Sequence, residues 1–468
     1  MYHGSNVDGL NPLHNAGMTS ELLTVAQAQE QILAAIAPLA EEAVTIEAAL
    51  DRVLARDVRC AGDVPPFASA AMDGYAVLAG PAGRKLQVIG ESRAGVPSEL
   101  VVGADQAIRT STGAAIPAGA DALVRQEQVE LEGDRVTLRV AVAAADDIRR
   151  PGEDFAAGAT ALRAGTELGP SELAAAAAAG ASELWCARRP RVAILCTGTE
   201  LRAPGEPLGP GQIHNSNAVT LAALATRCGA SVTPAECLAD DCAAIEAALA
   251  TALASADVVI VSGGVSMGPH DYVRPALDAL GVRESFWRVA VQPGKPTWFG
   301  TFTAGRSRVV DVGRQANSQS RRSRLVDVGR QANSQRRRSR LVDVGRQANS
   351  QRRRSRLIFG LPGNPVAAFV SFTLFTRPAL LALQGSIPDR GPEELAELGS
   401  SVKRDPARTQ AIRVRLERMD DRTIAIPNGP QGSNLISSLV GADALAMIPP
   451  GTGELEVGSR VALVALPR

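Results

Sequence analysis

The sequence predicts a multidomain α/β protein in which a doubly wound parallel-sheet domain is accompanied by smaller β domains. The 468-residue chain is too long for one ordinary hydrophobic core. From Arg191 onward, apolar strand-like runs alternate with helical runs, as in a parallel sheet covered by helices. Short apolar runs separated by Gly, Pro and Asp occupy 61–147 and 388–468 and predict β domains. The composition, with 45% apolar and 21% charged residues, is that of a globular protein.

The N-terminal half gives three further expectations. Residues 1–20 lack a basic segment followed by a long apolar core, so we expect a flexible tail and a cytoplasmic protein with no membrane segment. Residues 21–58 carry apolar residues at spacings of three and four, which predicts amphipathic helices. Residues 171–181, SELAAAAAAGA, predict a capped helix that ends near Gly180.

Individual strands and helices follow from the local pattern. The first β domain is predicted from YAVLA, LQVIG, ALVRQEQVEL and RVTLRV. The α/β domain is predicted from RVAILCTGTEL, NAVTLAALATRCGA, ASVTPAECL, AAIEAALATALASA and DVVIVSGGVS, and continues through VRPALDALGV, RVAVQPGKPTWFG and LIFGLPGNPVAAFVSFTLFTRPALLAL. The C-terminal β domain is predicted from IRVRLERM, TIAIPNG and VALVAL.

An arginine-rich tandem repeat interrupts the α/β domain. Residues 306–321, 322–337 and 338–353 are near copies of one 16-residue unit. A solenoid is one interpretation of this period, but each unit has too few apolar residues to offset the entropy of ordering the chain. We therefore expect a disordered loop of the kind that in-frame duplication of DNA leaves. Residues 306–356 hold 16 Arg and 3 Asp, while the rest of the chain holds 33 basic and 46 acidic residues. The host protein is acidic, and the loop would bind nucleic acid without specificity.

The cysteines and histidines argue against disulfides and a zinc site. The six cysteines include no CxxC pair, which favours reduced thiols. Only four histidines are present, and two of them fall in the N-terminal tail, which is too few for a histidine-based metal centre. A metal would need oxygen ligands, which indicates Mg²⁺.

Several loops at the predicted carboxyl ends of strands carry residues suited to phosphate and metal. Residues 262–266, SGGVS, directly follow an apolar strand, so backbone N–H groups and hydroxyls there suit an oxyanion, although a Gly pair also makes a plain tight turn. Lys295 lies between two prolines, where it meets an anion or solvent. Acidic residues occur at Glu200, at 240–241 and at Asp271, and carboxylates that converge on a phosphate usually hold Mg²⁺. The pair at 240–241 is alternatively a helix N-cap.

Two further loops, MDGY at 72–75 and RRPGED at 149–154, resemble ordinary turns when each is taken singly. Taken with the others they are not generic, because the sequence resembles the molybdopterin molybdenumtransferase family, which includes the C-terminal part of gephyrin. The resemblance spans almost the whole chain. The matching stretches are PPFASAAMDGYAV (65–77), RTSTGAAIPAGADALVRQE (109–127), RRPGEDFAAGA (149–159), LCTGTEL (195–201), GQIHNSN (211–217), VVIVSGGVSMGPHDY (258–272), VQPGKPTWFG (291–300) and FGLPGNPVAAF (359–369).

The resemblance implies the final step of molybdenum cofactor biosynthesis, in which molybdenum from molybdate is inserted into adenylylated molybdopterin and AMP is released. It implies Mg²⁺ as cofactor and handover of the product to molybdenum apoenzymes, with no specific nucleic acid and no membrane. It also implies an elongated homodimer, in which the small β domain of one subunit completes the cleft of the other.

Matching positions imply two sets of site residues. The catalytic set is Asp73, Asp154, Glu200, Asp240 and Asp271, of which Glu200, Asp240 and Asp271 are the metal candidates. The substrate-binding set is Thr112, Gly113, Asn215, Ser216, Asn217, Ser262, Gly263, Gly264, Ser266, Lys295, Pro362, Gly363, Asn364 and Pro365.

The same resemblance places the domain boundaries. They are an extended linker domain at 21–62 and 148–185, a small β domain at 63–147, a molybdopterin-binding α/β domain at 186–387 and a C-terminal β domain at 388–468. The chain departs from the family pattern before the MDGY core, where Ala and Ser replace a common Asp and Asn. Gln292 and Arg288 stand where lysine is frequent. These changes bear on molybdate affinity rather than on the reaction.

The repeat is the largest departure, and it leaves other functions open. Because the entropy cost of closing a loop grows only with the logarithm of its length, about 48 additional residues cost on the order of 1 to 3 kcal/mol, and folding should survive. One alternative is the related adenylylation of molybdopterin, which the α/β domain alone would suit. Others are a scaffold that binds a receptor peptide, as gephyrin does, and an enzyme inactivated by the repeat.

Overall fold

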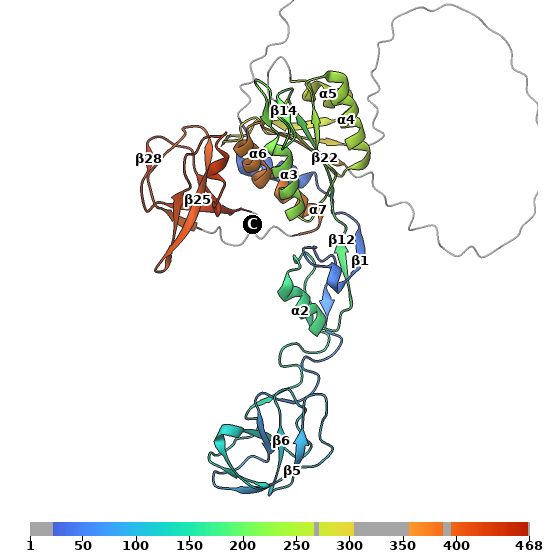
Figure 1. The fold of residues 1–468 in the computed structure, drawn as a ribbon, viewed down its shortest axis with the longest axis vertical. Helices are drawn as coiled ribbons and strands as arrows, with labels where there is room; N and C mark the ends of the chain where they lie inside the picture. The colour runs from blue at the N-terminus through green and yellow to red at the C-terminus, as the bar shows by residue number, and fades with distance from the viewer. Residues whose placement is uncertain (1–21, 266–270, 304–354, 387–394, 467–468) are drawn as a thin grey trace, which may run out of the picture. The chain divides into compact units, whose positions relative to one another are not determined.

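The computed structural model describes residues 22–265, 271–303, 355–386 and 395–466, and the chain divides into two compact units (Figure 1). Unit 1 comprises 1–37, 191–379 and 390–468, and unit 2 comprises 38–190 and 380–389. The predicted N-terminal tail, Ser266 and the repeat at 306–354 lie outside the described residues.

A seven-stranded sheet forms the centre of unit 1. Its order is β16-β13-β18-β22-β21-β19, and β17 also pairs with β13. The strands are β13 Arg191–Thr197, β16 Ser231–Val232, β17 Glu236–Leu238, β18 Val258–Ser262, β19 Arg283–Trp287, β21 Trp298–Phe302 and β22 Arg356–Leu361. The pairs from β16 to β22 are parallel, as the sequence predicts, whereas β21 is antiparallel to both of its neighbours. The sheet is therefore mixed at one edge.

Helices cover both faces of this sheet, which confirms the doubly wound prediction. They are α3 Ser216–Arg227, α4 Cys242–Ser255, α5 Val273–Ala279 and α6 Pro365–Ser371. A π-helical segment, Phe372–Thr376, and helix α7, Arg377–Leu383, follow α6, and residues 380–383 of α7 belong to unit 2. Helices α4 and α5 pack together on one face, and α3 and α6 pack together on the other (Figure 1). All five residues of β18 are buried as a result.

The run from α6 through α7 is the most apolar helical stretch. Residues Pro365–Leu383 are long and apolar enough to cross a membrane by length and composition, but 72% of the apolar window is buried inside the protein. Such burial is what a core helix of a globular domain requires.

The helix predicted over 21–58 is much shorter than expected. Helix α1, Val25–Ala34, begins after Thr24, whose hydroxyl accepts the N–H of Gln27 at 3.2 Å in a capping box. Beyond Ala34 the prediction is wrong, because β1 Glu41–Thr45 pairs antiparallel with β12 Glu183–Ala187. Apolar spacing alone cannot report a strand partner about 140 residues away in the sequence.

A closed barrel forms the C-terminal part of unit 1. Its strands are, in ring order, β25 Thr409–Met419, β26 Arg422–Pro427, β23 Leu395–Leu398, β29 Arg460–Ala465 and β27 Ala444–Ile448, and β27 pairs back with β25. Strand β20, Val291–Gln292, adds to β25 from the α/β part of the unit. A short ladder joins β24 Val402–Lys403 to β28 Glu454–Leu455.

Unit 2 contains a six-stranded sheet in the order β7-β4-β6-β5-β9-β8. Its strands are β4 Gly74–Val77, β5 Lys85–Ser92, β6 Gln106–Thr110, β7 Ala122–Arg125, β8 Val129–Glu132 and β9 Arg135–Leu138. The sequence runs predicted most of these strands but missed β6, and the run ALVRQEQVEL divides into β7 and β8 around a 3₁₀ turn.

The remaining elements of unit 2 form short ladders and one helix. They are β2 Val58–Arg59 with β11 Thr160–Leu162, β3 Ser69–Ala70 with β10 Ile148–Arg149, and α2 Pro170–Ala178. The predicted alanine-rich helix is confirmed, and it ends before Gly180, whose φ of +89° suits glycine.

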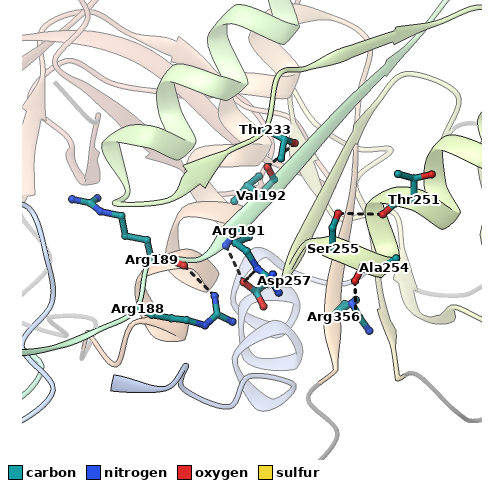
Figure 2. Close-up of polar contacts among 10 residues, drawn as sticks. All are labelled: Arg188, Arg189, Arg191, Val192, Thr233, Thr251, Ala254, Ser255, Asp257 and Arg356. Atoms are coloured by element: carbon teal, nitrogen blue, oxygen red, sulfur yellow. Dashed lines mark hydrogen bonds and ion pairs between the residues drawn. The ribbon is translucent and has the colours of Figure 1, made fainter. Parts of the chain in front are cut away.

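Polar contacts fasten the amino-terminal edge of the unit 1 sheet (Figure 2). The backbone N–H of Arg191, where β13 begins, donates to Asp257 Oδ2 at 2.9 Å. Arg356, where β22 begins, donates from Nη2 to the carbonyl of Ala254 at 3.2 Å. The carboxyl ends of the parallel strands lie at the opposite edge of the sheet. Ligands of open α/β sheets bind at that edge.

The two ends of the repeat-bearing segment meet in the described structure. Phe302 in β21 is the register partner of Arg356 in β22. One position beyond that pair, the hydroxyls of Thr303 and Ser355 are 2.9 Å apart. The sheet therefore pairs up to the last described residues on both sides of 304–354.

Candidate active site

A cavity of about 610 Å³ lies at the carboxyl ends of the parallel strands in unit 1. Strands β13, β18 and β22 each deliver a loop to it, as an open α/β sheet is expected to do. The lining residues are Cys196, Thr197, Glu200, Leu201, Ile213, His214, Asn215, Ser216, Ser262, Gly263, Gly264, Val265, Pro296, Pro362, Gly363, Asn364, Pro365, Asn434 and Ile436.

The glycine pair after β18 is required by close packing as well as by backbone conformation. Gly263 and Gly264 have φ of +93° and +63°. A Cβ on Gly263 would lie 2.6 Å from the carbonyl oxygen of Thr197, and one on Gly264 would lie 2.9 Å from the Thr197 hydroxyl. Because only glycine fits, the backbone of this turn sits directly on the end of β13. The N–H of Gly263 donates to the carbonyl of Leu361 at 3.1 Å.

Asn217 joins the end of β18 to the loop after β22. Its Nδ2 donates to Ser262 Oγ at 2.8 Å and to the carbonyl of Gly363 at 2.7 Å. Within the described ranges, the buried Asn217 Oδ1 and the buried Thr197 Oγ1 have no hydrogen-bond partner. Buried polar atoms normally find partners, so these two mark where a polar ligand or ordered water belongs.

The acidic residues after β13 and β17 divide into two kinds. Asp240 accepts hydrogen bonds from the N–H and the hydroxyl of Thr199, both at 3.3 Å, while Asp241 caps α4 by accepting the N–H of Ala244 at 2.8 Å. The N-cap interpretation therefore holds for Asp241 and not for Asp240. Glu200 lines the cavity, where its carboxylate lies against Gly198. Asp271 lies half-buried two residues before α5.

The donor set at this edge suits a cation with oxygen ligands. Among the residues that the structure describes, no group of three or more His, Cys, Asp or Glu side chains is gathered as a metal cage. Mg²⁺ usually keeps several waters and takes one or two carboxylates together with substrate phosphates, so Glu200 in the cavity wall and the nearby Asp240 fit it.

The loop after β22 is held by the C-terminal barrel. Asn364 Nδ2 donates to Ser433 Oγ at 3.1 Å, and the N–H of Val366 donates to the Ser433 carbonyl at 3.1 Å. The next residues, Asn434 and Ile436, line the cavity. The barrel thus supplies one wall of the site, which the sequence reasoning missed because nothing local marks this segment.

A buried arginine of β25, Arg413, organises that wall. Arg413 is 1% exposed, and its guanidinium donates from Nε to Ser438 Oγ at 3.1 Å and from Nη2 to the carbonyl of Gly432 at 3.3 Å. Burial lowers the pKa of Arg413 to about 10. The guanidinium still carries its charge at neutral pH and fixes both ends of segment 432–438.

The PGKP loop contributes less than the sequence suggests. Pro296 lines the cavity, whereas Lys295 is exposed and is not among the lining residues. The Gln292–Pro293 peptide bond is cis, and the N–H of Val289 donates to the Lys295 carbonyl at 3.0 Å. Lys295 therefore remains a prediction, and Pro296 is a further contact.

Cys196 was assigned only as a reduced thiol, yet it lines the cavity. It is the register partner of Cys237 in the parallel β13–β17 pair. Burial raises the pKa of Cys196 to about 11, the neighbouring Cys237 raises it further, and a hydrogen bond from Asn215 opposes both effects. This thiol is neutral at physiological pH, so it forms part of the cavity wall and does not act as a nucleophile.

Four of the predicted site residues belong to unit 2. Thr112 donates from its N–H and its hydroxyl to Asp73 Oδ1, at 2.7 and 2.8 Å. These two bonds, with a smaller effect of Arg109, hold the pKa of Asp73 below its usual range. Gly113 donates its N–H to the Ala70 carbonyl at 2.8 Å and has φ +79°.

Asp154, the fourth of these residues, is exposed, and its backbone holds the loop in place. Its N–H donates to the Val64 carbonyl at 2.9 Å, which fixes the PGED loop against the segment before β3. Neighbouring β3 and β10 pair, so the MDGY and PGED loops flank one ladder. The structure therefore brings Asp73, Thr112 and Gly113 together in unit 2, and Glu200, Asn215, Asn217, Ser262 and Pro362 together in unit 1.

Three family models match consecutive parts of the chain. The MoeA N-terminal region (domain I and II) matches 23–180, the probable molybdopterin binding domain matches 193–382, and the MoeA C-terminal region (domain IV) matches 396–466. Fold and site together thus define a multidomain α/β protein whose central domain is of the molybdopterin-binding type.

Similar proteins extend this match over nearly the full length. The molybdopterin molybdenumtransferase of Haemophilus influenzae is 30% identical over 94% of this chain and 98% of its own, and molybdopterin molybdenumtransferase 2 of Mycobacterium tuberculosis is 33% identical over 87% and 91%. The solved molybdopterin biosynthesis moeA protein of Pyrococcus horikoshii is 26% identical, with a TM-score of 0.72, over 95% of this chain and 100% of its own. The chain belongs to the molybdopterin molybdenumtransferase family.

Proposed function

We propose that this protein inserts molybdenum from molybdate into adenylylated molybdopterin and releases AMP. The observation that carries the proposal is the cavity itself, which is lined by the close-packed glycine turn and by Glu200. Asn217 holds Ser262 of its wall, and Asp240 is bonded to Thr199, next to Glu200 in the sequence. A phosphorylated ligand needs donors on one side and a means of offsetting its charge on the other, and this site has both.

Features of the described residues support one position for a phosphate of the ligand and another for its ring. Ser262 and the backbone after Gly263 lie where a phosphate of the ligand would bind, and Asn217 holds the Ser262 hydroxyl in position. The apolar side chains of Ile213 and Ile436 suit a ring rather than a phosphate. Cys196, which stays protonated, does not compete with the dithiolene of the substrate for molybdenum.

The proposal includes Mg²⁺ held by one or two of the predicted carboxylates, Glu200, Asp240 and Asp271, together with substrate phosphates and water. Bound there, Mg²⁺ would neutralise negative charge on the phosphates while the link to AMP is broken. The residues of the chain orient that site: Thr199 positions the Asp240 carboxylate through two hydrogen bonds. The unit 2 residues Asp73, Thr112 and Asp154 belong to the same proposed site through a homodimer in which a second subunit supplies them.

Three further statements rest on the same proposal. The protein acts in the cytoplasm, hands its product to molybdenum apoenzymes, and tolerates the repeat. The last is supported by the pairing of β21 with β22 up to Thr303 and Ser355, which shows the sheet formed on both sides of the insertion.

Reconstitution of a molybdenum enzyme tests this function. Purified protein is incubated with adenylylated molybdopterin, Mg²⁺ and molybdate, and then with a molybdenum-free apoenzyme whose activity is measured. Recovery of apoenzyme activity that requires all three additions supports the proposal. Formation of adenylylated molybdopterin from molybdopterin and ATP, without recovery, would instead identify the adenylylation step.

A further inference from the structure

Trp287 contacts both the glycine turn after β18 and helix α5, which lie on either side of residues 266–270 in the sequence. Its Nε1 donates to the carbonyl of Val265 at 3.2 Å, and Val265 is the last described residue of the glycine turn and lines the cavity. The next described stretch begins at Asp271 and leads into α5, where Arg274 places its guanidinium over the Trp287 ring, 4.1 Å from its centroid.

The indole is itself held by charged and apolar neighbours. The Arg288 guanidinium also lies over the ring, 4.0 Å from its centroid, and Arg274 donates to Glu284 Oε2 at 3.0 Å. Cation–π contacts of this kind are stronger where the groups are partly removed from water, and Trp287 is half-buried. Arg288 adopts φ +75°, an uncommon conformation for a residue with a side chain.

The side chains beneath the turn join the same assembly. A Cβ on Gly264 would lie 2.7 Å from Val273 Cγ2, and one on Gly360 would lie 2.8 Å from Val265 Cγ1. The turn is therefore clasped between α5 and β22 by close packing, while Trp287 supplies a polar contact to it from the edge strand β19.

We propose that Trp287 is a positioning residue for substrate binding, which fixes the glycine turn after β18 relative to the segment that begins at Asp271. It touches neither the phosphate nor the metal, and it acts through the Val265 carbonyl and through Arg274. This inference rests on the proposed function only in naming adenylylated molybdopterin as the ligand.

Trp287→Phe is the direct test, because phenylalanine keeps an aromatic face for both arginines and removes the N–H donor together with part of the ring. Trp185→Phe is the matched control: Trp185 also carries an arginine over its ring, Arg56 at 3.7 Å, but it lies in unit 2 and is not part of the cavity. Arg274→Met, which removes the second contact while keeping an extended side chain, is a further variant.

Two readouts are taken on the full-length protein. Hydrogen exchange, followed by mass spectrometry, measures amide protection in peptides that cover 258–265. Loss of one hydrogen bond to the turn should speed exchange there by about fivefold in Trp287→Phe, with no change in Trp185→Phe. Steady-state AMP release should show KM for adenylylated molybdopterin raised about fivefold with kcat retained, because ground-state binding is what the turn provides.

The outcomes separate this inference from the function on which it draws. If Trp287 only stabilised the fold, Trp287→Phe would lower kcat in proportion to the fraction of protein that remains folded and would leave KM unchanged. That result would overturn the proposal. Unchanged exchange at 258–265 in Trp287→Phe would overturn it as well. If the wild-type protein releases no AMP, the proposed function fails, while the exchange difference between the two variants still decides whether Trp287 holds the turn.

Discussion

Asp240 accepts two hydrogen bonds from Thr199, one from the backbone N–H and one from the hydroxyl, each 3.3 Å long. This contact connects the loop after β17 with the loop after β13, at the edge of the sheet where the cavity opens. The adjacent Asp241 takes no part in it and caps α4 instead. The two neighbouring carboxylates therefore have different roles, and the roles can be distinguished by substituting each residue in turn.

Asp240→Ala should lower the rate of AMP release by about 10- to 100-fold, the range expected when a metal ligand or its oriented partner is lost. Asp241→Ala should leave the rate unchanged and lower the free energy of unfolding by about 1 kcal/mol, because it removes only an N-cap. Steady-state kinetics and urea denaturation of both variants check this. Equal losses of rate in the two would show that Asp240 has no special role.

Asn217→Ala should be more damaging than substitutions of exposed residues in α3, because Asn217 supports the cavity wall through Ser262 and Gly363. It leaves the Ser262 hydroxyl and the Gly363 carbonyl without their buried donor, at a cost of about 1 to 3 kcal/mol in the free energy of unfolding, and it frees the glycine turn to move. KM for the substrate should rise as well. Thr226→Ala, on the exposed side of the same helix, serves as control. Unaltered substrate affinity in Asn217→Ala would contradict this account of the turn.

Cys196 should resist alkylation although it lines the cavity. With its pKa raised to about 11 by burial, only about one thiol in a thousand is ionised at pH 8, and the thiolate is the reactive form. Iodoacetamide should modify the exposed Cys242 well before Cys196. Peptide mass spectrometry of a time course measures the two rates. Labelling of Cys196 first would show that the thiol is ionised or that the wall opens.

Asp73 should stabilise the fold in a pH-dependent way. Hydrogen bonds from Thr112 hold its pKa below the ordinary value of 3.8, so the stabilisation is fully present above that value and is lost as the pH falls through the lowered pKa. Thr112→Val removes the hydroxyl donor. The stability difference between wild type and variant, measured by denaturation, should therefore be largest at neutral pH and shrink towards acid. A difference that grows in acid would contradict this assignment.

Excision of the repeat should leave the fold intact. The hydroxyls of Thr303 and Ser355 are 2.9 Å apart, so a short hairpin turn can replace residues 304–354. The melting temperature should stay the same or rise slightly, because a shorter loop costs less entropy to close. Thermal unfolding of the two forms measures this. A large loss of stability on excision would show that the repeat packs on the protein.

The sequence predicted the fold best where burial of an element determines both its residue pattern and its structure. The alternation after Arg191 predicted a doubly wound sheet because buried parallel strands read as continuous apolar runs. The division of β16 from β17 and the antiparallel β21 were not predicted, since the direction and pairing of such strands depend on their partners rather than on their own residues.

The candidate site was predicted in part for the same reason. Residues at strand ends, such as Ser262 and Pro362, were found because motif and topology coincide, and the structure places them around one cavity. Asn434 and Ile436 were missed because they reach the cavity through Ser433, a contact between segments about 70 residues apart. No local pattern encodes such a contact.

The most direct test of the central claim is AMP release from adenylylated molybdopterin with and without molybdate, using the full-length protein and Mg²⁺. The account predicts release that depends on molybdate and is strongly reduced in Asp240→Ala. Release at the same rate without molybdate would contradict insertion of the metal as the reaction. No release from either the full-length protein or the form lacking 304–354 would contradict the assignment of this cavity as a molybdenumtransferase site.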